Sequence, residues 1–346
     1  MPDRRATSAT PDGDAIQSGA VPDHANAAAT PNGRHAVVTG AFSNIGGAVA
    51  TALLARGWRV TTLTNREPGP GDDPRIERAP LVFDREALRD PLAGADVFVN
   101  TYWVRFPFRG MTFERAIANS QALIDAARDA GIARFVQVSV SNANPDSPLG
   151  YYSGKAAVEQ ALRESGLGYG IVRPTLVVGP NDVLTNNIAW FLRRFPVIAL
   201  PTGDGYLLQP VTLTDVGRIV ADAVEAADNV EVDAAGPDQL TFRQYLELLS
   251  GALHRPARFV PMPATLMTAA LSAVGLVLRD IVLTREELAG LATNMLLSHE
   301  PPLGHESVID WINEHGGAFG ARYMNDTKYR FRHAAVTIGK SGKTPA

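Results

Sequence analysis

The sequence predicts an α/β fold in which a doubly wound parallel sheet is followed by a smaller, mixed C-terminal lobe. Three observations support this prediction. Short apolar segments alternate with helical ones in the first half of the chain, a glycine-rich turn joins the first strand to the first helix, and the alternation loosens after Gly179. Such alternation is typical of parallel strands covered by helices on both faces. With 346 residues, the chain can form one large domain and a modest second lobe.

The order of the predicted elements follows from apolar runs and from the helical spacing of residues between them. We expect strands at residues 35–40, 58–64, 80–83, 96–100, 135–140 and 169–174, and helices at residues 45–56, 111–131 and 151–165. In the second half, Thr212, Thr241 and Thr284 each begin a capping box that opens a helix. Residues 230–234 are predicted to form one further strand.

These elements divide the chain into four segments. Residues 1–33 and 332–346 have the composition of a disordered leader and a disordered tail. Residues 34–180 form the predicted core, which contains the sheet. Residues 181–331 form a predicted substrate lobe of mixed structure, and some of its elements are expected to pack back onto the core. The tail ends in Gly-Lys-Ser-Gly-Lys-Thr, but Thr337 stands where a phosphate loop needs its first glycine, so we expect no phosphate site there.

Composition excludes several classes of function. The formal net charge of −4 and the absence of a Lys and Arg cluster predict no nucleic-acid partner. The chain has no cysteine, which removes disulfides, thiolate metal sites and cysteine nucleophiles. His299, His305 and Glu306 lie in a Pro-Gly loop without ligand spacing, so no metal is expected. The leader lacks a signal-peptide core, and we expect a cytoplasmic protein.

The segment Met262–Leu278 carries no charged residue. It is too short for a transmembrane span, and it contains Pro263 and several small polar residues. We expect a helix that is buried or faces a protein partner, with peripheral membrane docking as the alternative.

The turn between the first strand and the first helix has the residues that a dinucleotide pyrophosphate requires. Gly40 allows a sharp turn at the strand end, and Gly46 allows the helix start to pack closely on the sheet. The N–H groups at the helix start would point at the pyrophosphate. Residues 34–180 therefore predict a Rossmann-type dinucleotide-binding core. Its expected loop contacts also include Phe42, Ser43, Asn44 and Ile45.

This region resembles the short-chain dehydrogenase/reductase superfamily, in its extended or atypical branch, over roughly residues 35–250. The loop of that superfamily reads Thr-Gly-x-x-Gly-x-x-Gly, and the chain matches it at Thr39, Gly40 and Gly46. Ser43 replaces the middle glycine and can instead offer a hydroxyl to the phosphate. Within that branch, the chain is similar to epimerase/dehydratase-like and NmrA-like reductases and to the nucleotide-binding accessory subunit of respiratory complex I.

The resemblance implies further cofactor contacts. Asp84 stands where the superfamily's acidic residue meets the adenine, and Thr101 ends the fourth strand beside the nicotinamide ribose. Pro174 belongs to a segment that is similar to the superfamily's "RP…GP" signature after the sixth strand. Each of these residues can also be an ordinary turn or surface residue.

The end of the second strand indicates which cofactor is bound. An NAD enzyme usually has Asp or Glu there to hold the ribose 2′-hydroxyl. This chain has Asn65 and Arg66, and an arginine suits the 2′-phosphate of NADP. NADP is therefore the favoured cofactor, and NAD is the alternative.

Tyr151 and Lys155 match the superfamily's Tyr-x-x-x-Lys and would lie one turn apart on one helix face. A phenol titrates near 10, and a neighbouring ammonium favours its ionised form. Tyr152 is a rival for the same role. By resemblance, Ser141 holds the substrate oxygen and Ser139 supports the backbone or cofactor. The alternative is that both serines only satisfy backbone groups.

The Ser-Tyr-Lys set predicts an NAD(P)-dependent oxidoreductase or epimerase-like enzyme that acts on a carbonyl or hydroxyl group of a small molecule by hydride transfer. Tyr102, Trp103, Phe106 and Phe108 either begin its substrate pocket or only pack. The competing hypothesis is a regulatory or structural subunit that binds NAD(P) without turnover.

Overall fold

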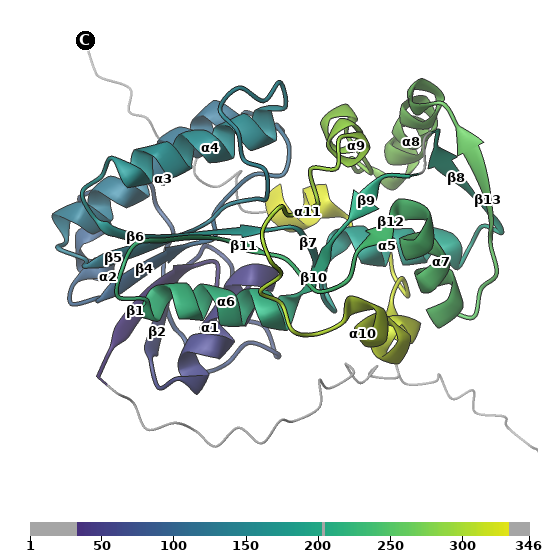
Figure 1. The fold of residues 1–346 in the computed structure, drawn as a ribbon. Helices are drawn as coiled ribbons and strands as arrows, with labels where there is room; N and C mark the ends of the chain where they lie inside the picture. Colours follow the sequence, from purple (N-terminus) through teal and green to yellow (C-terminus); the bar gives the residue numbers. More distant parts are fainter. Residues whose placement is uncertain (1–32, 203–204, 332–346) are drawn as a thin grey trace, which may run out of the picture.

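The computed structural model describes residues 33–202 and 205–331 (Figure 1). The predicted tail, and the predicted leader except for its last residue, lie outside the described residues. A seven-stranded parallel sheet with helices on both faces is joined to a smaller lobe of helices and short strands. The predicted Rossmann-type, doubly wound α/β fold is confirmed.

The central sheet has the strand order β11-β6-β5-β4-β1-β2-β3, and all of its neighbouring strands run parallel. Its strands are β1 (His35–Thr39), β2 (Arg59–Leu63), β3 (Glu77–Ala79), β4 (Val97–Asn100), β5 (Arg134–Val138), β6 (Gly168–Pro174) and β11 (Val230–Ala234). From β1 the chain builds outward to β2 and β3, and then returns to β1's other side to add β4. Such a reversal opens a crevice beyond the carboxyl ends of β1 and β4, where ligands of α/β sheets bind.

Two helical layers cover the sheet (Figure 1). On one face lie α2 (Arg89–Leu92), α3 (Phe113–Asp129) and α4 (Gly150–Arg163), and on the other lie α1 (Asn44–Ala55) and α6 (Leu213–Glu225). Leu123 of α3 and Leu162 of α4 belong to one fully buried cluster, while Leu53 of α1 and Val220 of α6 belong to the other. Because both faces of the sheet are buried, the sequences of its strands are apolar runs without polar alternation.

The second half of the chain contributes to both parts of the molecule. β11 completes the central sheet by pairing in parallel with β6, and α6 packs on one face of that sheet. Thr241 and Thr284 form the predicted capping boxes of α7 and α9, and Thr212 caps α6 by accepting the N–H of Asp215. The position of these helix starts was therefore predictable from short motifs.

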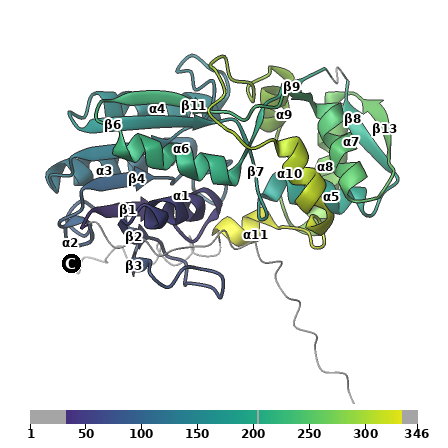
Figure 2. The ribbon, with the colours of Figure 1, turned by 60° about the horizontal axis from the view of Figure 1, so that its bottom comes forward.

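The lobe lies beyond the carboxyl ends of the sheet strands (Figures 1 and 2). Its helices are α5 (Val183–Leu192), α7 (Phe242–Ala252), α8 (Ala264–Leu278), α9 (Arg285–Ala292), α10 (Val308–His315), η1 (Gly316–Ala318) and α11 (Asp326–Phe331). Its strands form three two-stranded pairs from β7 (Leu176–Val178), β8 (Val197–Pro201), β9 (Leu207–Leu208), β10 (Pro210–Thr212), β12 (Leu240–Thr241) and β13 (Arg258–Met262).

Two predictions differ from the structure. The third strand covers Glu77–Ala79 and ends before the predicted residues 80–83, where Pro80 has no N–H to continue the ladder. The helix expected at 262–278 forms as α8, but it is not buried as a whole. Only Met267 and Gly275 are buried in it, whereas the side chain of Leu276 is 83% exposed. No helix in the described part of the chain is long and apolar enough to cross a membrane.

Candidate functional site

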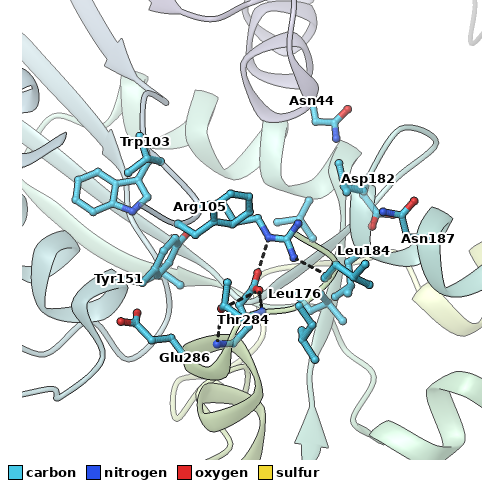
Figure 3. Close-up of a pocket in the computed structure, with 18 of the residues that line it drawn as sticks. Asn44, Trp103, Arg105, Tyr151, Leu176, Asp182, Leu184, Asn187, Thr284 and Glu286 are labelled. Atoms are coloured by element: carbon cyan, nitrogen blue, oxygen red, sulfur yellow. Dashed lines mark hydrogen bonds and ion pairs between the residues drawn. The ribbon is translucent and has the colours of Figure 1, made fainter. Parts of the chain in front are cut away.

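A large cavity lies at the carboxyl ends of β1, β4 and β5, between the sheet and the lobe (Figure 3). Its volume is about 1490 Å³. Pockets for a single small ligand are usually about 300–1,000 Å³. The cavity can therefore hold a dinucleotide together with a second molecule.

The turn after β1 has the backbone geometry that its glycines allow. Gly40 has a φ of 67°, in the left-handed region, and its N–H donates to Leu63 O at 3.0 Å. A Cβ on Gly46 would lie only 2.2 Å from Gly40 O, so only glycine lets the start of α1 approach the turn this closely. Both glycines thus have the conformational and packing roles that the sequence predicts.

The start of α1 faces the cavity without a side-chain cap. Ser43 is its N-cap residue, but the Ser43 hydroxyl donates to Gly40 O at 2.6 Å and does not cap the helix. The first turn of α1 contains no acidic residue. Its N–H groups and the positive end of the helix dipole therefore suit a phosphate. Asn44 donates its amide to Asn181 O at 2.7 Å and ties this turn to the lobe.

Arg66 and Thr101 lie on either side of the turn. The Arg66 guanidinium donates to Phe42 O and lies 3.6 Å from the Asp72 carboxylate. Thr101 donates its hydroxyl to Thr39 O and its N–H to Thr39 Oγ1, which fastens the end of β4 to the end of β1. The Thr101 contacts hold the ends of β1 and β4 together, at the place where a dinucleotide would bind.

Most of the predicted site residues line this one cavity. Those on its wall are Gly40, Phe42, Ser43, Asn44, Ile45, Arg66, Asp84, Thr101, Tyr151 and Lys155. Gly46, Ser141 and Pro174 do not line it. Gly46 acts through packing, and Pro174 contributes its carbonyl oxygen, which accepts the N–H of Ser141 at 3.0 Å.

Lys155 is buried at the base of the cavity. Its ammonium donates to Val138 O at 2.7 Å and lies 4.9 Å from the centre of the Trp103 ring. Burial lowers the pKa of Lys155 to about 7, although the carboxylate of Glu159 opposes that shift. The side chain can therefore exchange its proton near neutral pH.

Tyr151 lies beside Lys155 within an aromatic group. Its ring makes edge contacts with Trp103 and Phe113, at centroid distances of 6.2 and 6.3 Å (Figure 3). The rival Tyr152 also lines the cavity, but burial raises its pKa, which disfavours the ionised phenol. Of the two tyrosines, Tyr151 is the more accessible to a ligand.

The two predicted serines differ in how they lie relative to the cavity. The hydroxyl of Ser141 donates to Met295 O at 2.8 Å, and Ser141 is fully buried outside the cavity wall. Ser139 lines the cavity, and its buried Oγ has no hydrogen-bond partner in the protein. The structure therefore places Ser139, and not Ser141, on the cavity wall, because the loop after α9 covers Ser141.

Trp103 has a buried, unpaired indole N–H that the sequence does not reveal. Its ring packs between α4 and the cavity. The sequence suggested Trp103 only as part of an aromatic group, because an unpaired N–H has no signature in sequence. Together with Ser139, it places two unsatisfied donors on one cavity wall.

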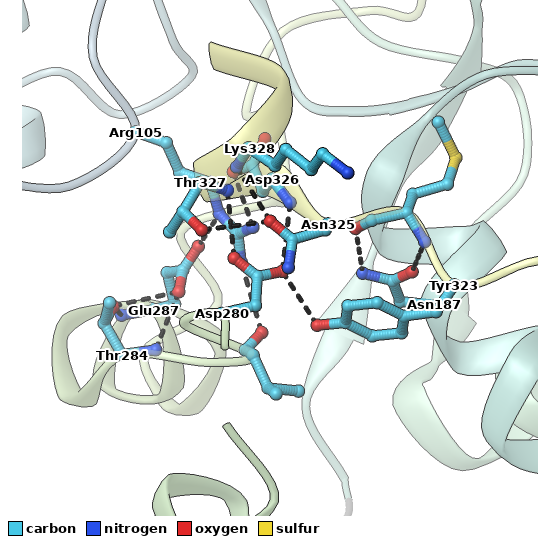
Figure 4. Close-up of polar contacts among 12 residues, drawn as sticks. Arg105, Asn187, Asp280, Thr284, Glu287, Tyr323, Asn325, Asp326, Thr327 and Lys328 are labelled. Atoms are coloured by element: carbon cyan, nitrogen blue, oxygen red, sulfur yellow. Dashed lines mark hydrogen bonds and ion pairs between the residues drawn. The ribbon is translucent and has the colours of Figure 1, made fainter. Parts of the chain in front are cut away.

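A polar network joins this cavity to α11 (Figure 4). Arg105, on the cavity wall, forms an ion pair with Glu287 of α9 and another, at 3.0 Å, with Asp326 of α11. The Asp326 side chain is completely buried. Asp280 accepts the N–H of Asp326 at 3.0 Å and the hydroxyl of Tyr323 at 2.9 Å. The sequence alone gives no sign of these long-range pairs.

Comparison with known proteins agrees with this geometry. A family model described as NAD(P)H-binding matches residues 40–187. This part of the chain is an NAD(P)H-binding domain. The match covers the glycine turn, the strand ends around the cavity and the Tyr151–Lys155 pair. The resemblance to the extended or atypical branch of the short-chain dehydrogenase/reductase superfamily is confirmed.

Of two curated relatives, one is named as a subunit of an NADH dehydrogenase and the other as a reductase. The chain is 26% identical over 253 residues to NADH dehydrogenase [ubiquinone] 1 alpha subcomplex subunit 9, mitochondrial, from Arabidopsis thaliana, covering 65% of this chain and 63% of the relative. It is 33% identical over 165 residues to the ceramide reductase of Caulobacter vibrioides, covering 46% of this chain and 52% of the relative. The chain thus spans about half to two thirds of the length of these relatives.

Among solved structures, the NADP(H) complex of the Citrobacter triphenylmethane reductase has the same fold. Its TM-score is 0.68 at 18% identity, and the match covers 81% of this chain and 99% of that protein. At 18% identity this likeness shows the fold, and the NAD(P)H-binding family model identifies the domain at residues 40–187.

Proposed function

We propose that this protein is an NAD(P)H-dependent oxidoreductase that transfers hydride between the nicotinamide and a carbonyl or hydroxyl carbon of a small molecule. One observation carries the proposal. Ser139 Oγ and Trp103 Nε1 are buried without protein partners on the cavity wall that also contains Tyr151 and Lys155. Buried polar groups are nearly always paired, so these two unpaired atoms, both on residues that line the cavity, support a ligand that pairs with them when the wall adjusts to it.

The residues around the glycine turn fit the dinucleotide. The uncapped start of α1 suits its pyrophosphate, and Gly46 lets this helix start lie close to the turn at Gly40. Arg66 on the cavity wall supports NADP as the preferred form, because a guanidinium matches a 2′-phosphate. When bound, the nicotinamide donates or accepts the hydride.

The protein's own groups handle the proton and the oxygen. Ser139 donates a hydrogen bond to the substrate oxygen and polarises its bond to carbon. Tyr151 gives that oxygen its proton in reduction and removes it in the reverse reaction. Lys155, whose pKa is about 7, holds the ribose hydroxyls and adjusts the charge beside the phenol. This set replaces the predicted Ser141 with Ser139.

A second candidate is a subunit that binds NAD(P)H without turnover. It is supported by the similarity to the complex I subunit, and by the exposed apolar helix α8, which offers a surface for a protein partner. In this case the buried Lys155 only anchors the cofactor.

The test measures NADPH and NADH oxidation with a panel of ketones, aldehydes and quinones. We expect Tyr151→Phe to lower kcat by about 10²–10⁴-fold with little change in cofactor affinity, because it removes the acid and keeps the ring. Ser139→Ala should also lower kcat. Ser141→Ala is the matched control and should keep the wild-type kcat, since Ser141 lies outside the cavity.

Three results would contradict parts of the proposal. A wild-type kcat for Tyr151→Phe removes this tyrosine from the chemistry. A larger loss in Ser141→Ala than in Ser139→Ala restores the assignment based on the sequence. Tight NADPH binding by the wild-type protein with no turnover of any panel member supports the non-catalytic subunit.

A further inference from the structure

The cavity extends well beyond the part that a dinucleotide would occupy. It continues from Tyr151 into the lobe, between α5, α7, β8, α8 and α9. Among the described residues that line it from Val183 to Leu283, none is charged, whereas Asp182 before this range and Arg285, Glu286 and Glu287 of α9 after it also line the cavity. Nearly all are aliphatic or aromatic, which distinguishes this apolar chamber from the polar turn after β1.

The few polar side chains in the apolar chamber are already engaged. Asn187 donates its amide to Met324 O at 3.0 Å and accepts the Met324 N–H at 2.8 Å. The hydroxyl of Tyr245 is bonded to the Thr185 hydroxyl at 2.8 Å. A polar ligand would lose its water here without gaining new partners, at a cost of several kcal/mol per group in an apolar site. Sugars and nucleotides therefore do not suit the apolar chamber.

One face of α8 forms the outer wall of the apolar chamber. Met267, Ala270, Leu271 and Val274 line it, at the three- and four-residue spacing of one helix face. These residues span on the order of 10 Å along the helix axis. The wall is thus elongated and apolar throughout, which matches an extended hydrocarbon chain better than a compact ring.

We propose that the substrate is an amphiphile whose carbonyl lies at Tyr151 and Ser139 and whose long hydrocarbon chain fills the apolar chamber beneath α8. The proposal rests on the oxidoreductase function proposed above and names the class of substrate for the same site. Chemically, hydride adds to the carbonyl carbon and a proton to its oxygen, so the carbonyl becomes a secondary or primary alcohol while NAD(P)H becomes NAD(P)⁺. The chain itself undergoes no reaction and provides binding energy.

The test compares the turnover of butanone, octan-2-one and dodecan-2-one by the NADPH-loaded protein. Each methylene buried in an apolar site improves binding about fourfold, so kcat/KM should rise by about 200-fold from butanone to octan-2-one. Binding of octan-2-ol and butan-2-ol is measured in parallel by calorimetry. This second measurement reports on the apolar chamber even if no ketone is reduced.

Two variants on α8 form a matched pair. Leu271→Glu places a charge on the chamber wall and should abolish the dependence on chain length, whereas Leu276→Glu places it on the 83% exposed outer face and should not. Ala270→Trp, at an exposed position on the wall, narrows the chamber and should weaken dodecan-2-one most. Ala269→Trp, also exposed but off the wall, is its control.

The outcomes separate the two proposals. Equal kcat/KM for butanone and octan-2-one overturns the chain inference and leaves the oxidoreductase function in place. Binding of octan-2-ol that is tighter than that of butan-2-ol, without any turnover, overturns the catalytic function and supports the apolar chamber. Equal and weak binding of both alcohols overturns the chain inference whether or not turnover occurs.

Discussion

Replacing Lys155 by Met should stabilise the protein at neutral pH while it removes the proposed cofactor contact. Burial lowers the pKa of this lysine from 10.5 to about 7. The unfolded chain therefore binds more protons than the folded one between pH 7 and 10.5, and the wild-type protein gains stability as pH rises through that window. The penalty of burying Lys155 is fully present below about pH 7 and disappears towards pH 10.5.

The magnitude follows from the two pKa values. Each pH unit of difference corresponds to about 1.4 kcal/mol, so the burial penalty is about 4 kcal/mol at pH 7 and about 2 kcal/mol at pH 9. Met keeps most of the side-chain volume and does not titrate. Val138 O loses the lysine donor but keeps the amide of Gln137 at 2.7 Å, and we allow about 1 kcal/mol for the lost contacts. Lys155→Met should thus be about 3 kcal/mol more stable than wild type at pH 7, and about 1 kcal/mol more stable at pH 9.

The assay is urea unfolding, followed by circular dichroism at both pH values after the dinucleotide has been removed. Lys328→Met is the matched control, because Lys328 is exposed and should show no such pH dependence. The reasoning is refuted if Lys155→Met is less stable than wild type at pH 7, or if its advantage is the same at pH 7 and pH 9. Either result would mean that Lys155 is hydrated or paired in solution.

Two further variants test the cofactor preference and the polar network. Arg66→Ala should weaken NADPH binding by about tenfold or more and NADH binding much less, because only NADPH has a 2′-phosphate for the guanidinium; titration of both cofactors checks this. Arg105→Met should lower the free energy of unfolding by about 3–5 kcal/mol, because it removes the cation that faces the fully buried Asp326 carboxylate; the urea midpoint checks this.

Each of these two variants has a control variant at another arginine. Arg75→Ala removes an arginine that pairs with Asp73 outside the cavity, and it should leave NADPH affinity unchanged. Equal losses of NADPH and NADH in Arg66→Ala would show that this arginine does not read the 2′-phosphate. Arg109→Met changes an exposed arginine, and a destabilisation as large as that of Arg105→Met would rule out the buried ion pair as the cause.

Much of the cofactor side of the site was predictable because its determinants are local. The strand, glycine turn and helix are contiguous, and Gly40 and Gly46 are needed at fixed positions for φ and for close packing. Tyr151 and Lys155 share a helix, so their spacing of four places them near each other in any fold that forms α4. Capping boxes such as that of Thr284 also mark helix starts from four adjacent residues.

The rest of the cavity was not predictable, since its contacts join residues far apart in sequence. Ser139 and Ser141 are both serines on the same face of the strand end, so the sequence does not distinguish them. In the structure, the Ser141 hydroxyl donates to the carbonyl oxygen of Met295, 154 positions away, whereas the Ser139 hydroxyl has no partner. The same holds for Arg105, whose partner Asp326 lies 221 positions along the chain.

The sequence by itself determined the α/β class, the dinucleotide turn and the Tyr151–Lys155 pair, because backbone conformation and helical periodicity depend on near neighbours. The tertiary structure alone decided which serine faces the cavity, that Trp103 and Ser139 have no protein partner, and that α8 encloses an apolar chamber on one face and is exposed on the other. Burial and hydrogen-bond satisfaction are properties of the packed chain, since each depends on which distant segment comes to cover a residue.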